Sequence, residues 1–377
     1  MTSRRRHVAV VVPSLTRGGA ERVAETLAHQ FARTCRVTVV TMEPRLTPRE
    51  LRATDAPPWT GRIPAGCHHV HLPAAGSGLP RLATLVVRFA LLARREEFDA
   101  VYSFLMWTNV LVTLAKLLGG RYAHVASEHA MADTLRGDRP RLLSVATTLP
   151  VVYRRPDWIV VVSDAARASL GSAGLLPRPG RAVTIPNPVD GEEIRRLAAA
   201  PCDLPEPAAD RVVLVCVGRL HEHKDHRTLL RAMTRLPEGY CLVLVGDGPL
   251  RDELAQDVDR LGLGGRVTFT GVLLNPYPLM RRADVVVLPS KQEGFGLIAA
   301  EAAALGRPFV GSAVGGLAEL CALLGQPTVE VGDDAGLAAT IVRLASEPSA
   351  GGTASALVDS AFDPAAIAAR YLRLTSG

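Results

Sequence analysis

Two glutamates flank a glycine-rich turn in the C-terminal half of the chain, within PSKQEGFGLIAAE at 289–301. We expect Glu293 in a loop and Glu301 about one turn into the helix that follows. Gly294 and Gly296 permit close backbone approach, and a helix start offers N–H groups that lack intrahelical partners. A loop carboxylate can accept hydrogen bonds from sugar hydroxyls, and a helix carboxylate can bind a ribose diol. The alternative is two unrelated glutamates around a turn.

A basic pair follows the apolar run at 212–217. Arg219 and Lys224 stand five positions apart there, and Lys224 is one of only three lysines in the chain. Ligands of open α/β sheets bind beyond the carboxyl ends of the strands. The forked guanidinium and the compact ammonium together suit a diphosphate. A solvated loop is the other interpretation.

The possible metal ligands have weaker patterns. A lysine stands among the three histidines near 224 and would repel a cation, so we expect no metal at His221, His223 and His226. We expect surface positions in a long loop for His68, His69 and His71. The one DxD sequence, at 257–259, falls in a predicted helix and favours a solvated face over a metal clamp. We therefore expect no bound metal or other cofactor.

A third candidate is the RGGAER segment at 17–22, directly after the first apolar run. Gly18 and Gly19 would let backbone N–H groups approach an anion at a helix start. The segment is not GxGxxG, and GxxxxGK[ST] is absent from the chain, so dinucleotide and P-loop binding are disfavoured. An ordinary tight turn between strand and helix stays open.

A fourth candidate, His129, follows Glu128 at the end of a predicted strand. A lone histidine is usually structural, but catalytic groups gather at this end of the strands in α/β sheets. We expect His129 in the active site.

Short β-branched runs alternate with segments of helical spacing, and this pattern predicts the α/β class. Helices are expected, for example, at 226–235, at 277–282 and at 164–170, where Ser163 is the cap. Cys216, within the apolar run at 212–217, is expected to be a small core residue. The alternation fits two doubly wound Rossmann-like domains that face each other across a cleft. We place the domains at 1–186 and 187–361, with a final helix in 362–377 that packs back on the first domain. Prolines and glycines at 44–80 favour a long loop.

The composition of the 377 residues, 48% hydrophobic and 21% charged, indicates a soluble protein with a sizeable core. Through residue 190 the net charge is +11, against −5 for the remainder. This bias favours an anionic partner or a membrane surface, or it is a solvated arginine-rich face. Six cysteines without a CxxC pair, no signal peptide and no spanning helix predict a cytoplasmic protein.

Several of these motifs together resemble the GT-B retaining glycosyltransferases of family four, also called glycosyl transferases group 1. The resemblance covers essentially the whole chain in order. It rests on GGAER (18–22), SEHA (127–130), VSDAAR (162–167), VGRLHEHKD (217–225), LVGDGPLRDEL (244–254) and the E-x7-E motif EGFGLIAAEAAALGRP (293–308). IPNPVD (185–190) departs from the family's more usual NG at Asn187-Pro188.

The resemblance implies a role for each candidate. Arg219 and Lys224 would bind the donor diphosphate, and Glu301 the ribose. Glu293 would hold hydroxyls of the donor sugar, and His129 would lie by the anomeric centre. Phosphate and sugar would also meet the backbone of Gly18, Gly19, Gly294, Phe295, Gly296 and Leu297. Members retain anomeric configuration and generally need no metal.

The resemblance therefore predicts transfer of a hexose or N-acetylhexosamine from a nucleotide diphosphate-sugar, with UDP favoured. The acceptor is a lipid-linked glycan or a small natural product or carbohydrate; nucleic acid is not expected as a partner. Alternatives are a GT-B sugar-nucleotide isomerase and a degenerate sugar-nucleotide-binding subunit. The apolar, arginine-bearing segment at 82–95 is either a buried helix with a basic end or a peripheral contact with the inner membrane face.

Overall fold

The computed structural model describes residues 4–15, 18–42, 63, 65–132, 152–176, 180–202, 210–347 and 351–376. These residues form two compact units. Unit 1 holds the described residues up to Pro188 together with 364–376, and unit 2 holds those from Val189 to Asp363. The chain thus passes between units at 188/189 and at 363/364, each two residues later than the boundaries expected from the sequence.

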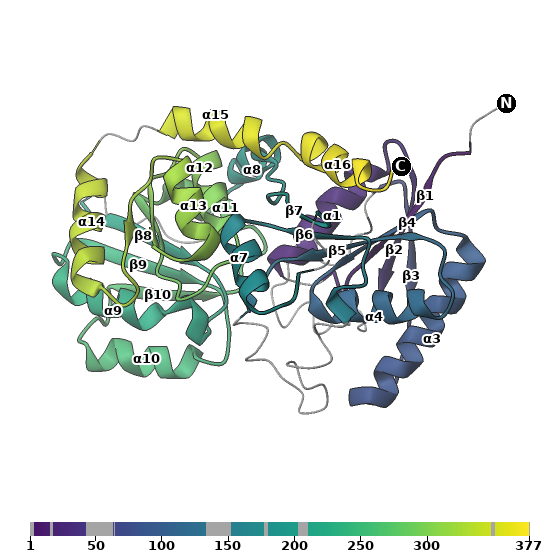
Figure 1. Ribbon diagram of the computed structural model, residues 1–377. Coiled ribbons are helices and arrows are strands. Elements are labelled where there is room, and N and C mark those ends of the chain that lie inside the picture. Colours follow the sequence, from purple (N-terminus) through teal and green to yellow (C-terminus); the bar gives the residue numbers. More distant parts are fainter. Residues whose placement is uncertain are drawn as a thin grey trace. The chain divides into compact units, whose positions relative to one another are not determined.

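Unit 1 is built on a seven-stranded parallel sheet in the order β3-β2-β1-β4-β5-β6-β7 (Figure 1). Continuous apolar runs form its middle strands because helices cover both faces of such a sheet. The strands are β1 (His7–Val11), β2 (Arg36–Thr41), β3 (Cys67–His71), β4 (Ala100–Phe104), β5 (Ala123–Glu128), β6 (Trp158–Val161) and β7 (Ala182–Thr184).

The helices of unit 1 bury apolar side chains. They are α1 (Gly19–Phe31), α3 (Gly78–Glu96), α4 (Met106–Leu117), α7 (Asp164–Ser172) and the C-terminal α16 (Pro364–Arg373). Ser163 caps α7 as predicted, since its hydroxyl accepts a hydrogen bond from the Ala166 N–H at 3.1 Å. Helix α16 packs against α1, so the two ends of the described chain meet in one unit.

The long loop predicted at 44–80 is wrong for its second half. Residues 67–71 form the edge strand β3, which pairs in parallel with β2, and α3 begins at Gly78. His69 and His71 both hydrogen-bond the Thr41 hydroxyl, at 2.9 and 3.2 Å. Only His68 of the three histidines is exposed. Prolines and glycines on either side of a short polar edge strand hid it from the sequence pattern.

Unit 2 repeats the architecture with a six-stranded parallel sheet in the order β10-β9-β8-β11-β12-β13. The strands are β8 (Val212–Val217), β9 (Tyr240–Val245), β10 (Val267–Gly271), β11 (Val285–Leu288), β12 (Phe309–Ser312) and β13 (Thr328–Val329). Its helices are α8 (Gly191–Ala198), the short 3-10 turn η1 (Glu222–Lys224), α9 (His226–Arg235), α10 (Arg251–Arg260), α11 (Tyr277–Arg282), α12 (Leu297–Ala304), α13 (Gly315–Leu323), α14 (Asp334–Ser346) and α15 (Gly351–Ala361).

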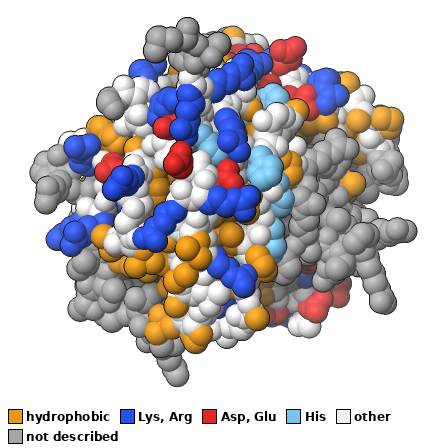
Figure 2. Space-filling view, turned by 90° about the vertical axis from the view of Figure 1, so that its right-hand side faces the viewer, with side chains coloured by type: hydrophobic (Ala, Val, Ile, Leu, Met, Phe, Trp, Pro, Cys, Tyr) orange, Lys and Arg blue, Asp and Glu red, His pale blue; other side chains and the backbone are white. Residues whose placement is uncertain are grey.

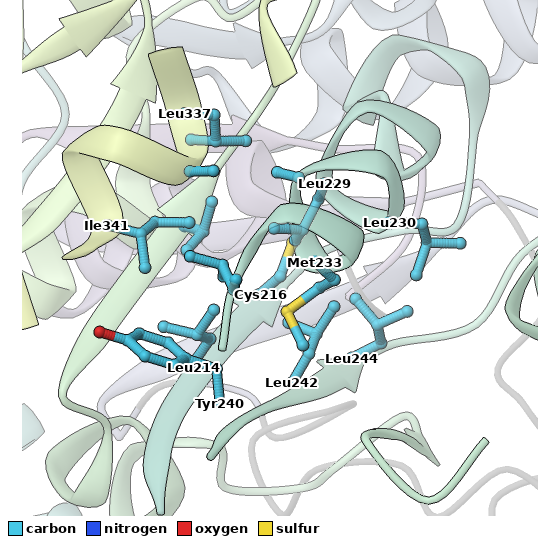
Figure 3. Close-up of a cluster of buried hydrophobic side chains, with 14 of the residues drawn as sticks. Leu214, Cys216, Leu229, Leu230, Met233, Tyr240, Leu242, Leu244, Leu337 and Ile341 are labelled. Atoms are coloured by element: carbon cyan, nitrogen blue, oxygen red, sulfur yellow. The ribbon is translucent and has the colours of Figure 1, made fainter. Parts of the chain in front are cut away.

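The core of unit 2 lies between its sheet and the helices α9 and α14. Figure 3 shows Leu214 and Cys216 from β8 facing Met233 of α9 and Ile341 of α14. All four are at most 4% exposed. The prediction that Cys216 is a small core residue is confirmed.

Three helices of unit 2 were not expected from the sequence: α8, α14 and α15. The segments of α14 and α15 are rich in Ala, Gly and Ser, whereas α8 is short and charged. Helix α14 shows why a segment of the first kind is missed. Its apolar residues include Leu337 and Ile341 on the buried side but also Val342, which is 39% exposed. An apolar pattern spread around the helix does not give a clear period.

Both sheets reverse their strand order at one point, and the candidate residues follow the strands at these points. In unit 1, β1 lies between β2 and β4; in unit 2, β8 lies between β9 and β11. The loop after β8 carries Arg219 and Lys224, and the loop after β11 carries Glu293. Parallel neighbours end at the same edge, so the topology brings these two loops together.

Candidate active site

Two glycines let the loop after β9 pack directly behind the loop that carries Arg219. The Gly218 N–H donates to the Val245 carbonyl at 2.9 Å. A Cβ on Gly246 would lie 2.0 Å from the Gly218 oxygen, and one on Gly248 would lie 2.3 Å from the Leu220 oxygen. Only glycine fits at either place, which explains the glycines of LVGDGPL at 244–250.

Arg219 is the exposed cation of this edge. Its side chain forms no hydrogen bond or ion pair with the residues that the structure describes. The neighbouring Leu220 is fully buried, and its N–H donates to the Asp247 carbonyl at 3.0 Å. A fixed backbone therefore presents a guanidinium whose donors are all available to a ligand.

Lys224 and Glu293 form an ion pair across the two loops. Their side chains are 29% and 18% exposed. The Lys224 methylene stem packs 3.6 Å or more from the place where a Gly218 side chain would begin. The Ser290 hydroxyl donates to the Glu293 carboxylate at 3.4 Å. The residues predicted to hold diphosphate and sugar therefore hold each other in this structure.

Further contacts hold the two loops together. The Lys291 N–H donates to the His223 carbonyl at 2.8 Å, and the Lys291 ammonium lies 3.6 Å from carboxylate oxygens of both Glu222 and Asp225. Asp225 has a left-handed backbone, with φ of 45°, and is buried. Such a conformation is costly for a residue other than glycine, so this turn is held by its surroundings.

The turn between Glu293 and Glu301 is tightly packed. Gly296 adopts φ of 92° at the N-cap of α12, where a side chain would meet Leu317 at 2.9 Å. Phe295 is buried and its ring meets Phe362 edge-on, with the ring centroids 5.3 Å apart. Glu301 lies on α12 with 1% of its surface exposed. Gly294 is also buried, while Leu297 is half-buried.

The histidines around Lys224 do not converge. The rings of His221 and His223 stack on each other, with centroids 4.9 Å apart, whereas His226 is buried at the start of α9. Burial, together with nearby Lys224, lowers the pKa of His226 to about 4. Among the described residues, no group of three or more His, Cys, Asp or Glu side chains is placed to hold a metal ion.

The DxD segment lies on α10, and Asp257 is tied to two arginines there. It bonds Arg227 at 3.1 Å and pairs with Arg260. The expected solvated face holds for Asp259, which is exposed, but is wrong for Asp257, whose side chain is 13% exposed and compensated by these arginines.

In unit 1 the glycine-rich turn after β1 is closed by its own glutamate. The Glu21 carboxylate accepts hydrogen bonds from the Gly18 N–H and, at 2.9 Å, from the Ser14 hydroxyl. This reciprocal cap leaves no room for a side chain at Gly18. The Gly18 amide, expected to face a phosphate, is engaged by Glu21 here, while Gly19 is exposed.

His129 lies directly beyond the end of β5 and is half-buried. Its Nε2 bonds the Ser127 hydroxyl at 3.0 Å, and that hydroxyl also bonds the Tyr371 hydroxyl at 2.9 Å. Burial lowers the pKa of His129 to about 4, and an interaction with Asn187 opposes this shift. The imidazole is therefore neutral near pH 7.

A buried carboxylate fixes the backbone of His129. One Glu128 oxygen accepts from the N–H groups of His129 and Ala130, at 3.0 and 3.2 Å. The other oxygen accepts from the Tyr153 hydroxyl at 2.7 Å. Burial raises the pKa of Glu128 against the lowering effect of these hydrogen bonds. Glu128 thus sets the direction in which His129 leaves the strand.

Sequence reasoning did not find Tyr371 or Tyr153, which complete this network. Tyr371 comes from α16, 244 positions from its partner Ser127. Its ring also stacks on Phe104, with the centroids 6.4 Å apart. An apolar helical pattern holding one tyrosine at 371 was the only available signal, and it does not indicate a partner.

Comparisons with known proteins agree with the residue patterns. A family model described as "Glycosyltransferase Family 4" matches residues 17–193, and one described as "Glycosyl transferases group 1" matches residues 211–347. One similar protein is the lipopolysaccharide core biosynthesis glycosyltransferase LpsD of Rhizobium meliloti, 39% identical over 186 residues. That alignment covers 46% of this chain and 52% of LpsD, so the chain spans about half the length of this relative.

A second relative aligns over a longer stretch. It is the N-acetylgalactosamine-N,N'-diacetylbacillosaminyl-diphospho-undecaprenol 4-alpha-N-acetylgalactosaminyltransferase of Campylobacter jejuni, 25% identical over 303 residues, or 79% of this chain and 78% of that protein. Among solved structures, Anabaena HepE in complex with UDP and glucose is similar with a TM-score of 0.78 and 22% identity, over 98% of this chain and 99% of that one. This likeness shows that the fold is GT-B, with two Rossmann-like domains.

Proposed function

This chain belongs to the family-four glycosyltransferases, whose two family models match its two halves, and we propose that it transfers a hexose or N-acetylhexosamine from a nucleotide diphosphate-sugar to an acceptor hydroxyl. One observation carries the proposal. An exposed Arg219 and the Lys224–Glu293 pair stand together where β8 and β11 end, at the point where the strand order reverses. This edge is where α/β sheets bind nucleotides.

Arg219 and Lys224 bind the donor diphosphate in this proposal. Departure of a nucleoside diphosphate leaves about two negative charges, and fixed positive groups stabilise such charge without reorganisation. The guanidinium is free of protein partners among the described residues, and the ammonium has one carboxylate partner. Two cations together supply what a metal ion supplies elsewhere, so we propose that transfer is metal-independent.

Binding of the donor exchanges the partners of the Lys224–Glu293 pair. Lys224 turns to the phosphate, and the released Glu293 carboxylate accepts hydrogen bonds from sugar hydroxyls. Each charged group keeps a partner before and after the exchange, so neither is left desolvated alone. The N–H groups at the start of α12, around Phe295 to Leu297, add donors for sugar and phosphate.

In this proposal, His129 is a neutral hydrogen-bonding group for the donor sugar. A pKa near 4 means that its imidazole is neutral near pH 7 and carries a proton on only one ring nitrogen. The leaving phosphate oxygen is then the group that takes the proton of the acceptor hydroxyl. Attack on the same face from which the phosphate departs gives retention of configuration.

Two observations bear on donor and acceptor. The similar structure of HepE contains UDP and glucose, which supports a UDP-linked hexose as the donor. The names of LpsD and of the Campylobacter transferase refer to lipopolysaccharide and to a diphospho-undecaprenol, which supports a lipid-linked glycan as the acceptor. A small carbohydrate or natural-product acceptor is the other choice. Cytoplasmic action stays a prediction.

A thermal-shift titration tests the donor site first. UDP, GDP, ADP and dTDP are compared, each with magnesium and with EDTA, for the wild type and for Arg219→Ala. A nucleotide at about 100 times its dissociation constant adds roughly 2.7 kcal/mol of stability. We expect a magnesium-independent shift with UDP that Arg219→Ala reduces.

Transfer is then measured with radiolabelled UDP-glucose and UDP-N-acetylglucosamine, using extracted lipid-linked glycans and soluble sugars as acceptors. A nucleotide shift without transfer to any acceptor, and without slow donor hydrolysis, would support a sugar-nucleotide-binding subunit instead. No shift with any nucleotide or nucleotide sugar would overturn the donor site.

A further inference from the structure

Helix α3 exposes an apolar stripe on the side opposite its buried face. Val87 and Leu91 lie one turn apart on this side and are 51% and 57% exposed. The inner face is packed into the core of unit 1 through residues that include Phe89 and Ala93. The helix therefore has an apolar surface on both sides, and only one of them is covered by the described residues.

Arginines border this stripe, and the one acidic residue of α3, Glu96, lies at its C-terminal end, 3.6 Å from the Arg95 guanidinium. Arg88, Arg94 and Arg95 are exposed, and the helix holds no Asp or Glu from Gly78 to Arg95. Glu96, the last residue of α3, is mostly buried and bonds Arg36 at 3.2 Å. Figure 2 shows hydrophobic side chains gathered on the lower part of this face of the molecule, with Lys and Arg side chains beside them.

The stripe continues onto the end of α4. Leu117 and Leu118 are 60% and 47% exposed. The Arg94 guanidinium donates to the Leu118 carbonyl, so these two leucines lie beside the C-terminal turn of α3. We call the four exposed apolar residues on this side and the three arginines the α3 patch: Val87, Leu91, Leu117, Leu118, Arg88, Arg94 and Arg95.

The positive charge of the α3 patch indicates which kind of partner it can bind. A single exposed leucine needs no explanation, but a group of them rimmed by one sign of charge marks an interaction surface. Arginine stems lie along apolar surface while their guanidinium groups reach phosphates, which is the arrangement at the boundary between acyl chains and headgroups. No helix among the described residues is long and apolar enough to cross a membrane, so any such contact of these residues is peripheral.

We propose that unit 1 docks on an anionic lipid surface through the α3 patch, with the leucines and Val87 at the acyl boundary and the arginines on lipid phosphates. Unit 2 also exposes apolar residues, such as Leu323 and Val342, at 49% and 39%. Arg343 beside Val342 is already paired with Glu347 at 3.1 Å. Unit 2 therefore offers exposed apolar residues that serve as a control, and the docking does not depend on the identity of the sugar donor.

Co-sedimentation with vesicles tests the proposal on the full chain. One set of vesicles is phosphatidylcholine alone, and the other contains about 40% phosphatidylglycerol. We expect the wild type to partition at least about tenfold more strongly onto the anionic vesicles, and less so as salt is raised. Val87→Asp/Leu91→Asp should lower that partition at least about tenfold, while Leu323→Asp/Val342→Asp should leave it unchanged.

Two further measurements separate the contribution of the arginines to vesicle binding from that of the apolar residues and from loss of the fold. Arg88→Gln/Arg95→Gln should weaken binding and flatten its salt dependence, since it removes charge and keeps the leucines. Nucleotide thermal shifts of all variants report whether they fold and bind donor. Equal binding by the patch variant and the wild type, or no binding by the wild type, overturns the proposal. If sedimentation velocity shows a dimer that the patch variant abolishes, and vesicles bind nothing, a second copy covers the patch instead.

Discussion

The polar residues at the strand ends of the two units are held in opposite ways. In unit 1, Glu128 is buried and its oxygens are bonded to Tyr153 and to the backbone of His129. In unit 2, Arg219 is exposed and Lys224 and Glu293 are partly exposed and paired with each other. A buried network cannot change partners without leaving a group unsatisfied, whereas a solvent-accessible pair can. Unit 1 thus fixes the position of His129, and unit 2 supplies charged side chains that can exchange their present partners for a ligand.

The largest effect should come from Glu293→Gln, which keeps the shape of the side chain and removes its charge. The variant replaces the charged acceptor for sugar hydroxyls by a neutral amide and leaves Lys224 without its anionic partner. We expect kcat to fall roughly 10³-fold, the upper range for removing one transition-state contact, while the fold persists. Single-turnover transfer assays check this, with circular dichroism for the fold. Glu253→Gln, an exposed glutamate paired with Arg227, is the control and should react as the wild type does.

Arg219→Ala should lower kcat/KM roughly 10²-fold, because one donor to the departing diphosphate is lost. Its melting temperature should equal that of the wild type, since the side chain touches no described partner. Steady-state kinetics and calorimetry measure the two quantities. Arg235→Ala, which removes an exposed arginine paired with Asp334, serves as the control for charge. A drop in melting temperature without a drop in rate would show that Arg219 has a structural role instead.

Mild acid should destabilise unit 1 more than unit 2. Burial lowers the pKa of His124 to about 3 and of His129 to about 4 in unit 1, while His226, at about 4, is the comparable group in unit 2. The unfolded chain takes up protons on these histidines near pH 6.5, well before the folded units do. Stability is therefore lost as pH falls below about 6.5, on the order of 1 kcal/mol per histidine by pH 5.5.

Hydrogen–deuterium exchange at pH 7.5 and pH 5.5, read by peptides from each unit, measures this difference. His124→Gln should reduce the pH dependence of unit 1 and leave that of unit 2 unchanged. Equal loss of protection in both units would contradict the assignment.

The smallest effect should come from Tyr371→Phe. The substitution keeps the ring stacked on Phe104 and removes the hydroxyl that bonds Ser127. We expect a loss of about 1 kcal/mol of unfolding free energy, typical of one hydrogen bond, and a severalfold lower kcat as His129 loses part of its support. Urea denaturation and transfer assays measure these. Tyr240→Phe, in the core of unit 2, is the control, and an equal change in kcat there would remove Tyr371 from the site.

The strand and helix pattern of the central elements could be read from local sequence. Runs such as 212–217 and 285–288 are apolar because both faces of a parallel sheet are covered, and α9 and α11 have the bounds that were predicted. The Glu293 turn and the Arg219–Lys224 pair could be predicted for the same reason. In each case the charged residues follow the end of their strand by only a few positions. Local signals failed at β3, α14 and α15, where polar edges or scattered small residues give no clear period. The charged helix α8 does have a local signal, the Asp190 side chain that caps its N-terminus.

The sequence by itself determined which residue types stand at the strand ends, because the alternation of strands and helices and the glycine-rich turns are local. Only the tertiary structure decided which of these residues pair with each other. The register of β11 beside β8 sets Glu293 against Lys224, 69 positions away, and the return of α16 sets Tyr371 on Ser127. Likewise only the fold decided that one face of α3 stays uncovered by described residues. Such pairings depend on sheet register and packing, which no short segment encodes.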